Sequence, residues 1–188
     1  MPSRTPRLSD LQPIDRDTEC INVVVETARD SRTKLAYDPR SSAFVVRQVL
    51  PQGMSFPFDF GFIPSTRGGD GDPLDVLVLM DEPVPPGTIV PSRLIGVIEA
   101  KQTEKDGKTE TNDRLIAVAA AHELLSRVKQ LSDLPASVTD QIEHFFISYN
   151  EQHGKRFEPT GRHGAKRAEA LLENGRRAYR RSKKSKSR

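Results

Sequence analysis

The sequence predicts an α+β fold, mainly β, in which short strands form a small closed barrel and helices pack outside it. Two observations lead to this prediction. Short runs rich in valine and isoleucine, separated by turn signals, fill the first two-thirds of the chain. After about residue 120, apolar side chains recur at helical spacing instead. With 188 residues, the chain is long enough to bury a single core.

Five runs are predicted to be strands, because β-branched residues favour the pleated surface and the runs are too short for average helices. They cover residues 21–26, 43–49, 75–79, 94–100 and 114–119. Turns that contain proline or glycine separate them, at residues 38–42, 51–53 and 82–87. A DG pair at residues 106–107 predicts the turn of a further hairpin.

Two helices are predicted in the last third of the chain. Residues 136–151 place a set of apolar side chains on one helical face: Val138, Ile142, Phe145, Phe146 and Tyr149. Residues 164–180 form the second predicted helix, whose inward face would consist of Ala165, Ala168, Leu171 and Leu172.

Positive charge is concentrated at the C-terminus. The chain has 29 Lys and Arg against 26 Asp and Glu, a net charge of +3. Residues 176–188 contain eight of the basic residues and no acid, which leaves residues 1–175 with a net charge of −5 (+3 less 8). We therefore expect one domain over 1–175 and a basic tail over 176–188, which should be disordered beyond the second predicted helix. Such a tail makes at most a weak, salt-sensitive contact with nucleic acid or other polyanions.

Other features of the sequence exclude several classes of protein. No apolar run approaches the roughly 20 residues that a membrane-spanning helix needs, and the N-terminus lacks a secretory signal pattern. Cys20 is the only cysteine, so neither an intrachain disulfide nor a cysteine-based metal site is available. The histidines have no metal-binding spacing and are interpreted as structural or exposed: His122, His144, His153 and His163. These features predict a cytoplasmic protein that does not contact a membrane.

The most informative stretch is GGDGDPLDVLVL, residues 68–79. Asp70, Asp72 and Asp75 fall within six residues, on a turn that leads directly into a predicted buried strand. An unpaired carboxylate at the start of such a strand is unfavourable unless it meets a cation. Three hard oxygen donors at this density suit Mg²⁺ or Mn²⁺. An EF-hand loop does not fit, because Leu74 and Asp75 would stand where that loop needs a ligand and a glycine.

Residues 56–100, FPFDFGFIPSTRGGDGDPLDVLVLMDEPVPPGTIVPSRLIGVIEA, resemble the barrel-fold family of soluble inorganic pyrophosphatases (family I). The resemblance implies an OB-like barrel and Mg²⁺-dependent hydrolysis of inorganic pyrophosphate, with Mn²⁺ as the other candidate metal. It also implies that Asp70 and Asp75 hold the metals and that Asp72 is the general base. The prokaryotic members commonly assemble into hexamers, so the resemblance implies a homo-oligomer.

The same resemblance extends to residues outside the acidic turn. It implies that Asn112 ligates a metal and that Glu26 is an outer metal partner. The implied phosphate-binding residues are Lys34, Arg47, Arg114 and Tyr149. An arginine can hold a phosphate through two parallel hydrogen bonds, whereas a lysine acts as a point charge.

The chain also departs from the family pattern. Phe56 and Phe60 stand where the family usually has tyrosines. Gln102 and Asn112 stand where it has two aspartates, and Arg114 stands where it has a lysine. An amide oxygen can ligate Mg²⁺ but brings no negative charge, so we expect these replacements to weaken metal binding.

The segment that contains these amides, residues 102–113, is about five residues longer than the family pattern. Its acids are candidates for the missing charge. We interpret Glu104, Asp106 and Glu110 as solvated turn charges. Asp113 is the best substitute by position, but alternation along a strand would point it to the side opposite Asn112.

Two alternatives stay open at this point. A divergent member of the family could act on another phosphoanhydride or phosphoester. A small barrel with a basic tail could instead bind nucleic acid, with a stacking platform made of Phe56, Phe58, Phe60 and Phe62. The net acidic body opposes this second alternative.

Overall fold

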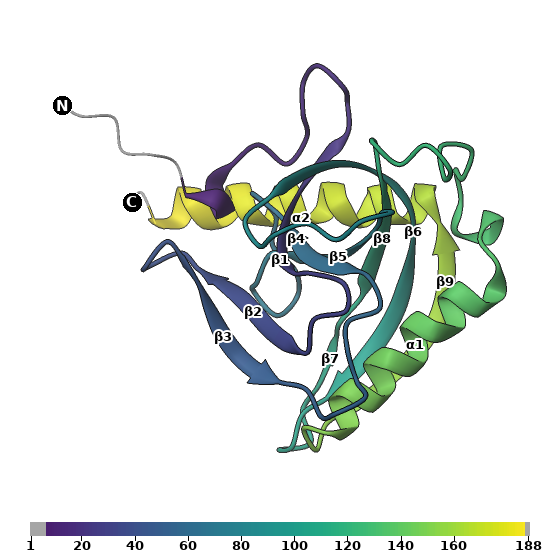
Figure 1. Ribbon diagram of the computed structural model, residues 1–188. Helices are drawn as coiled ribbons and strands as arrows, with labels where there is room; N and C mark the ends of the chain where they lie inside the picture. The colour runs from purple at the N-terminus through teal and green to yellow at the C-terminus, as the bar shows by residue number, and fades with distance from the viewer. Residues whose placement is uncertain (1–6, 187–188) are drawn as a thin grey trace.

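The structure is a computed structural model that describes residues 7–186, and its centre is a ring of five hydrogen-bonded strands (Figure 1). In ring order these are β1 (Ile21–Thr27), β4 (Asp59–Ile63), β5 (Leu74–Leu79), β8 (Arg114–Ala119) and β6 (Ile89–Thr103). The ring is continuous because β6 pairs with β1 as well as with β8. This arrangement confirms the predicted mainly β, barrel-like fold.

The remaining strands lie outside the ring. They are β2 (Thr33–Asp38), β3 (Ala43–Val49), β7 (Thr109–Thr111) and β9 (Arg156–Gly164). β2 and β3 form a separate antiparallel hairpin, while β7 and β9 both pair with the long strand β6. Two short 3₁₀ helices complete the described part of the chain, η1 (Leu8–Asp10) and η2 (Leu131–Asp133).

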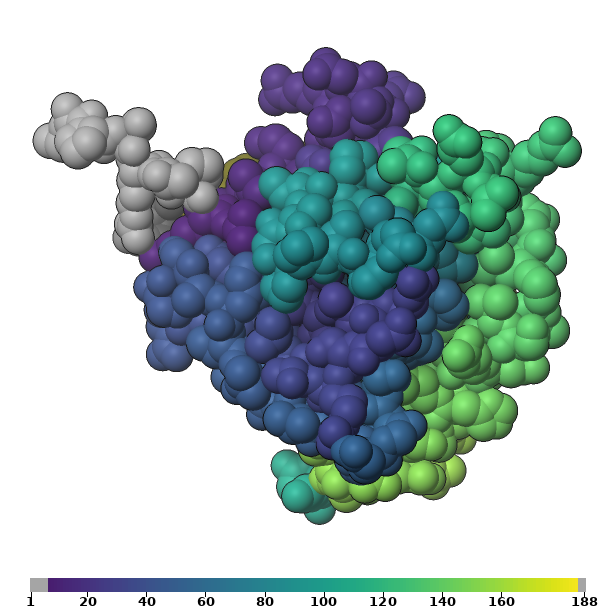
Figure 2. Space-filling model, in the orientation of Figure 1, coloured from purple at the N-terminus to yellow at the C-terminus, as the bar shows by residue number. Residues whose placement is uncertain are grey.

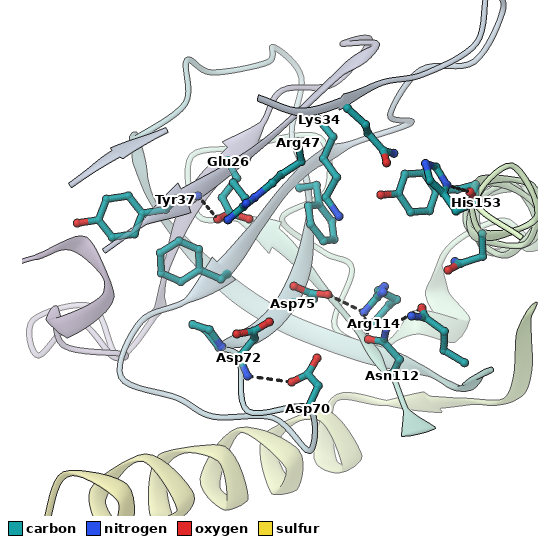
Figure 3. Close-up of a pocket in the computed structure, with 18 of the residues that line it drawn as sticks. Glu26, Lys34, Tyr37, Arg47, Asp70, Asp72, Asp75, Asn112, Arg114 and His153 are labelled. Carbon is teal, nitrogen blue, oxygen red and sulfur yellow. Dashed lines mark hydrogen bonds and ion pairs between the residues drawn. The ribbon is translucent and has the colours of Figure 1, made fainter. Parts of the chain in front are cut away.

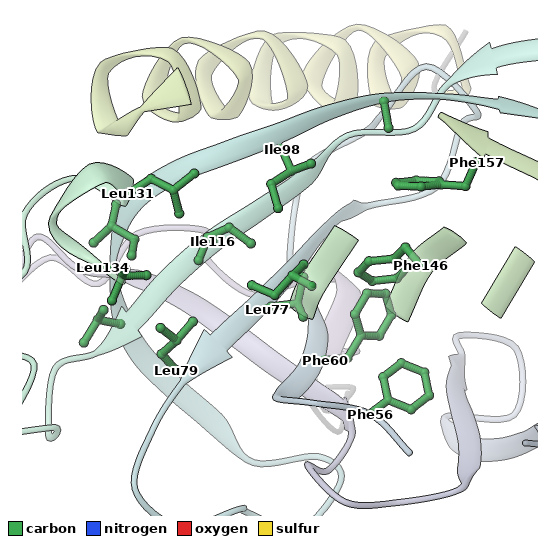
Figure 4. Packing of buried hydrophobic residues seen from close by; sticks show 14 of the residues in the cluster. Phe56, Phe60, Leu77, Leu79, Ile98, Ile116, Leu131, Leu134, Phe146 and Phe157 are labelled. Carbon is green, nitrogen blue, oxygen red and sulfur yellow. The ribbon is translucent and has the colours of Figure 1, made fainter. Parts of the chain in front are cut away.

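Two α-helices cover the sheet, α1 (Ala136–Glu151) and α2 (Ala165–Lys186). Successive side chains of a strand point to opposite faces, so β5, β6 and β8 each contribute to two apolar clusters. Leu77 of β5 packs in the cluster that contains Phe146 of α1 (Figure 4). Its neighbour Val78 packs in the cluster that contains Leu172 of α2. The buried strand β5 is thus held between two helices, and this fixes the position of the acidic turn that precedes it.

Helix α2 is longer than predicted. It continues through residue 186, so the prediction of disorder beyond residue 180 is wrong for residues 181–186, and the predicted domain boundary after 175 falls inside a helix. Lysine and arginine are good helix formers, and their charges are favourable at a helix C-terminus. The Tyr179 hydroxyl also donates a hydrogen bond to Asp10, which ties the helix to η1. Residues 187–188 of the predicted tail lie outside the described residues.

The surface has one projecting segment near the N-terminus. Residues 12–20 stand out from the rest of the molecule in the space-filling view (Figure 2), and a bridge between Ile14 and Ile21 closes the base of this segment. None of the helices in the described range combines the length and the apolar character that a membrane crossing needs.

Candidate active site

A cavity of about 510 Å³ opens between the β2–β3 hairpin, the start of β5 and α1 (Figure 3). All of the site residues predicted from the sequence line it: Glu26, Lys34, Arg47, Asp70, Asp72, Asp75, Asn112, Arg114 and Tyr149. They come from β1, β2, β3, β5, β8, α1 and the loops between them. The fold therefore gathers residues from distant parts of the sequence into one cavity.

Backbone contacts hold the acidic turn in place. The Gly68 N–H donates to the carbonyl oxygen of Asp72 at 2.6 Å, and Gly71 has a φ of +93°, a conformation that favours glycine. The Asp72 N–H donates to Oδ1 of Asp70 at 3.0 Å. Strand β5 begins directly after this turn, so Asp75 lies on the strand while the other two carboxylates lie on the turn.

Three of the cavity carboxylates, Glu26, Asp72 and Asp75, have pKa values above their usual range. Burial raises the pKa of Asp72, and the negative charges of Asp70 and Asp75 raise it further. Burial also raises the pKa of Asp75, although the Arg114 guanidinium, 2.7 Å from its Oδ2, acts in the opposite direction. Burial raises the pKa of Glu26 to about 7, against a backbone hydrogen bond to its Oε1. Burial is the largest cause of the raised pKa in all three carboxylates.

The chemistry of this donor set fits a divalent cation. Carboxylate oxygens are the ligands that Mg²⁺ and Mn²⁺ prefer, and a cation would relieve the repulsion between them. Within residues 7–186, however, no group of three or more Asp, Glu, His or Cys side chains is arranged to hold a metal ion as it stands. Asp75, for example, faces Arg114. The donors therefore suit the predicted metals, while their arrangement is not that of a closed coordination shell.

Two cations reach the cavity from the β2–β3 hairpin, across from the acidic turn (Figure 3). The Lys34 Nζ lies 5.2 Å from the centroid of the Tyr149 ring and 5.5 Å from that of Phe60. Arg47 is more exposed, and its positive charge opposes the upward pKa shift of Asp72, whose main cause is burial. One wall of the cavity is thus acidic and the opposite wall is basic.

Arg114 brings a third cation next to the acidic turn. Its side chain is almost completely buried, and its guanidinium lies 4.7 Å from the centroid of the Phe146 ring. Its Nη1 donates to Oδ2 of Asp75 and to Oδ1 of Asn112. The Asn112 Nδ2 in turn donates to Oε1 of Gln102 at 2.8 Å. The Asn112 side-chain oxygen therefore contacts a cation, the Arg114 guanidinium.

The hairpin of the inserted segment forms as predicted, with β6 paired to β7 around Gly107, whose φ is +84°. The interpretation of Glu104 as a solvated turn charge is wrong, because its carboxylate pairs with Lys155 at 2.8 Å. Oδ1 of Asp113 accepts a hydrogen bond from the Ala100 N–H at 3.2 Å, and the residue does not line the main cavity. Asp113 is therefore not positioned to replace a missing carboxylate there.

Sequence reasoning missed other residues of the cavity. His153, interpreted from the sequence as structural or exposed, is partly exposed and lines this cavity. Its ring lies 5.1 Å from the Tyr149 ring, and its Nδ1 lies 2.6 Å from the Tyr149 carbonyl oxygen. The sequence signal for this contact was the four-residue spacing between Tyr149 and His153, which places two side chains next to each other on a helix. Tyr37, Gln102 and Lys155 line the cavity as well.

Comparisons with known proteins agree with this site. The sequence model of the Pyrophosphatase family, described as inorganic pyrophosphatase, matches residues 23–180. The chain is 37% identical over 142 residues to the inorganic pyrophosphatase of Thermus thermophilus, covering 76% of this chain and 78% of that protein. It is 33% identical over 159 residues to the inorganic pyrophosphatase of a Nostoc species, covering 85% and 91%.

Solved structures lead to the same family. The crystal structure of the Thermus thermophilus inorganic pyrophosphatase aligns with a TM-score of 0.84 at 32% identity, covering 93% of this chain and 99% of that one. The inorganic pyrophosphatase of Helicobacter pylori aligns with a TM-score of 0.78 at 31% identity, covering 90% and 98%. On the strength of the family match and these relatives, this chain belongs to the inorganic pyrophosphatase family.

Proposed function

We propose that this chain hydrolyses inorganic pyrophosphate to two phosphate ions, with Mg²⁺ as the metal and Mn²⁺ as the second candidate. The observation that carries the proposal is the cavity in which an acidic turn faces a basic hairpin. A complex of pyrophosphate with a divalent metal needs both, because carboxylates bind the metal and cations bind the phosphates. Membership of the inorganic pyrophosphatase family points to the same substrate.

The acidic turn is the proposed centre of the chemistry. Asp70 and Asp75 are the proposed metal ligands, with Glu26 as an outer partner, and Asp72 is the proposed general base. When bound, divalent metal would lower the pKa of the attacking water and neutralise phosphoryl oxygens. The Asp72 carboxylate would accept the proton that this water loses as it attacks phosphorus. Its position on the same turn as Asp70 supports this role.

The basic wall is the proposed binding site for the phosphates. Lys34 and Arg47 supply positive charge from the hairpin, and the Tyr149 hydroxyl can donate a hydrogen bond to a phosphate oxygen. Arg114 supplies a third cation beside the acidic turn. Because phosphoryl transfer depends mainly on positioning and charge stabilisation, these four residues would contribute much of the rate enhancement.

Asn112 is the predicted metal ligand with the least structural support. Its only side-chain oxygen, Oδ1, accepts a hydrogen bond from Arg114 Nη1. That oxygen would hold a metal ion as its main partner only if the guanidinium moved away. The site proposed here therefore relies on the carboxylates rather than on this amide.

The alternative functions have less support. Phe56, Phe60 and Phe62 are buried, and Phe56 packs against Phe60 with ring centroids 5.6 Å apart, so these rings offer no exposed platform for nucleic-acid bases. A different phosphoanhydride substrate has no specific observation in its favour.

We also propose that the protein forms a homo-oligomer, with a hexamer expected from the family resemblance, and that it acts in the cytoplasm. Val46, Val49 and Leu124 are exposed apolar side chains that contacts between copies could cover. Sedimentation velocity tests the assembly. A hexamer is expected at micromolar concentration, and a monomer under these conditions would contradict the proposal.

The activity is tested by phosphate release from three substrates: pyrophosphate, ATP and a phosphomonoester. With Mg²⁺ or Mn²⁺ present, pyrophosphate should be hydrolysed much faster than the other two. EDTA should abolish the reaction, and excess Mg²⁺ should restore it. Preference for ATP would favour the divergent-hydrolase alternative, and no turnover of any substrate would contradict the proposed activity.

A further inference from the structure

A chain of polar contacts leads from the inserted hairpin to Arg114. Lys155 Nζ pairs with Glu104 at 2.8 Å, and Glu104 Oε1 accepts a hydrogen bond from Gln102 Nε2 at 2.6 Å. Gln102 Oε1 accepts from Asn112 Nδ2 at 2.8 Å, and Asn112 Oδ1 accepts from Arg114 Nη1. The two amides therefore connect an ion pair on the hairpin to a buried guanidinium in the cavity.

The charges at the two ends fix the orientation of both amides. A carboxylate only accepts hydrogen bonds, so Gln102 must present its NH₂ group to Glu104 and its oxygen to Asn112. Asn112 must then present its NH₂ group to Gln102 and its oxygen to Arg114. A guanidinium only donates hydrogen bonds, so Arg114 needs an acceptor, and the Asn112 oxygen supplies it. With Gln102 absent, the Asn112 NH₂ group would lose its acceptor in this series, and only the contact with Arg114 Nη1 would orient the amide.

Arg114 is held by one of its terminal nitrogens only. Nη1 is directed to Asp75, Asn112 and the Asp113 carbonyl oxygen. In the described part of the chain, no hydrogen bond uses Nη2, and the buried Nε has no partner. The ring of Phe157 lies 5.7 Å from the guanidinium and adds to the contact with Phe146 described above. One terminal nitrogen is thus anchored, and the other is left without a protein acceptor in a cavity that suits phosphate.

We propose that Gln102 is a positioning residue: through Asn112 it holds Nη1 of Arg114, so that Nη2 stays directed at a phosphate oxygen of the substrate. This inference rests on the proposed pyrophosphatase function. It gives Asn112 the task of orienting a cation rather than of ligating a metal. It also gives the insertion a purpose, because the β6–β7 hairpin carries Glu104, whose N–H bonds the Lys108 carbonyl oxygen at 2.8 Å across the turn.

The test is a double-mutant cycle between Gln102 and Arg114. Gln102→Met keeps the length of the side chain and removes both of its hydrogen bonds. We expect it to lower kcat/KM for pyrophosphate about tenfold, mainly through a higher KM, because a hydrogen-bond series that ends on a charged group is disturbed. In the Arg114→Lys background, the planar guanidinium with its two terminal nitrogens is already lost. There the change at position 102 should lower kcat/KM by less than about twofold. Gln102→Asn, which is too short to bridge both partners, serves if the methionine variant folds poorly.

The matched control is Glu110→Gln. Glu110 lies opposite Gln102 in the β6–β7 pairing and forms an ion pair with Lys108, outside the cavity. This variant should leave kcat/KM within about twofold, since it does not touch the series of amides. Circular dichroism and Tm identify any variant whose fold is damaged.

Binding of imidodiphosphate in the presence of Mg²⁺, measured by calorimetry, repeats the cycle without turnover. Its dissociation constant should rise about tenfold in Gln102→Met and should hardly change in the Arg114→Lys background. Equal losses in both backgrounds, or no loss in either, would overturn the positioning role. Because this readout needs no hydrolysis, it separates a failure of this inference from a failure of the proposed activity.

Discussion

Single residues carry the chemistry of this protein, and the acidic turn shows how far a sequence motif can define them. All nine predicted site residues line one cavity, and the motif itself fixes the three aspartates at the start of β5. The pairing between side chains was not available from the sequence. Arg114 and Asp75 are 39 positions apart, and their contact exists only because β5 and β8 are neighbours in the ring. The roles of Gln102 and Glu104 follow from contacts of the same kind.

Asp72 should act on the attacking water rather than on the fold. Asp72→Asn keeps the size of the side chain and removes the base, so phosphate release should fall by about two orders of magnitude or more. Mg²⁺ binding, measured by calorimetry, should persist. Asp106→Asn, an exposed acid in the hairpin turn, is the control and should keep full activity. Loss of Mg²⁺ binding in Asp72→Asn with an intact single-turnover rate at saturating metal would assign the residue to the metal instead.

Glu26 should make the stability of the metal-free protein depend on pH. Its pKa of about 7, raised mainly by burial, lies above the ordinary value of 4.5. The folded state therefore binds more protons than the unfolded state between these values, and the free energy of unfolding falls as pH rises through this window.

Glu26→Gln tests this effect, because it keeps an oxygen that can accept the hydrogen bond from the Tyr37 N–H and cannot ionise. Thermal unfolding of metal-free samples should give the variant a higher Tm than the wild type at about pH 8, and a nearly equal Tm below about pH 4.5, where Glu26 is protonated in both states. The same Tm difference at both pH values would contradict the assigned pKa.

Among the helices and strands, the sequence predicted the bounds correctly where the local residue types and the pattern of buried side chains indicate the same element. Strand β8 and helix α1 have the predicted bounds, since each is marked by apolar residues at its own period. Strand β9 was missed because Pro159 and Gly161 are unusual inside a strand. It forms by pairing with β6, where Pro159 lies opposite Ala100 next to an irregularity in register. This strand is set by a tertiary contact that its local sequence does not announce.

The contact between β1 and β4 depends on the absence of a side chain at Gly61. A Cβ atom there would lie 2.0 Å from the Val24 carbonyl oxygen, which belongs to backbone and cannot move freely. Gly61→Ala should therefore lower the free energy of unfolding by about 3 kcal/mol in urea denaturation. Gly69→Ala is the control, because a Cβ there meets no atom within 4 Å. Equal stability of the two variants would mean that the strands do not approach this closely.

At the scale of the whole molecule, charge is unevenly distributed: residues 1–175 carry a net charge of −5, whereas the last turns of α2 are basic. Arg180, Arg181 and Lys184 are exposed at positions three and four residues apart, on one face of the helix. The helical conformation of this segment, instead of the predicted disorder, gives the positive charge a defined surface. None of these residues lines the cavity, so the basic surface and the proposed catalysis should be independent.

Changing Arg180, Arg181 and Lys184 together to Gln tests this independence while keeping good helix formers in place. The variant should elute from heparin at lower salt than the wild type, because fewer counterions are released on binding. Its kcat for pyrophosphate should stay within about twofold. Unchanged heparin retention would show that other surfaces bind polyanions, and a loss of kcat at both low and moderate salt would mean that the end of α2 belongs to the catalytic unit.

A metal ion held by the acidic turn is what would make this protein a pyrophosphatase. The most direct measurement is the initial rate of phosphate release from pyrophosphate as a function of Mg²⁺ concentration, for the wild type and for Asp75→Asn with the same circular dichroism spectrum. The wild-type rate should saturate with Mg²⁺ and vanish in EDTA, and the variant should be slower by at least about two orders of magnitude at the Mg²⁺ concentration that saturates the wild type. A variant with wild-type rates, or wild-type activity that survives EDTA, would contradict metal activation at this turn.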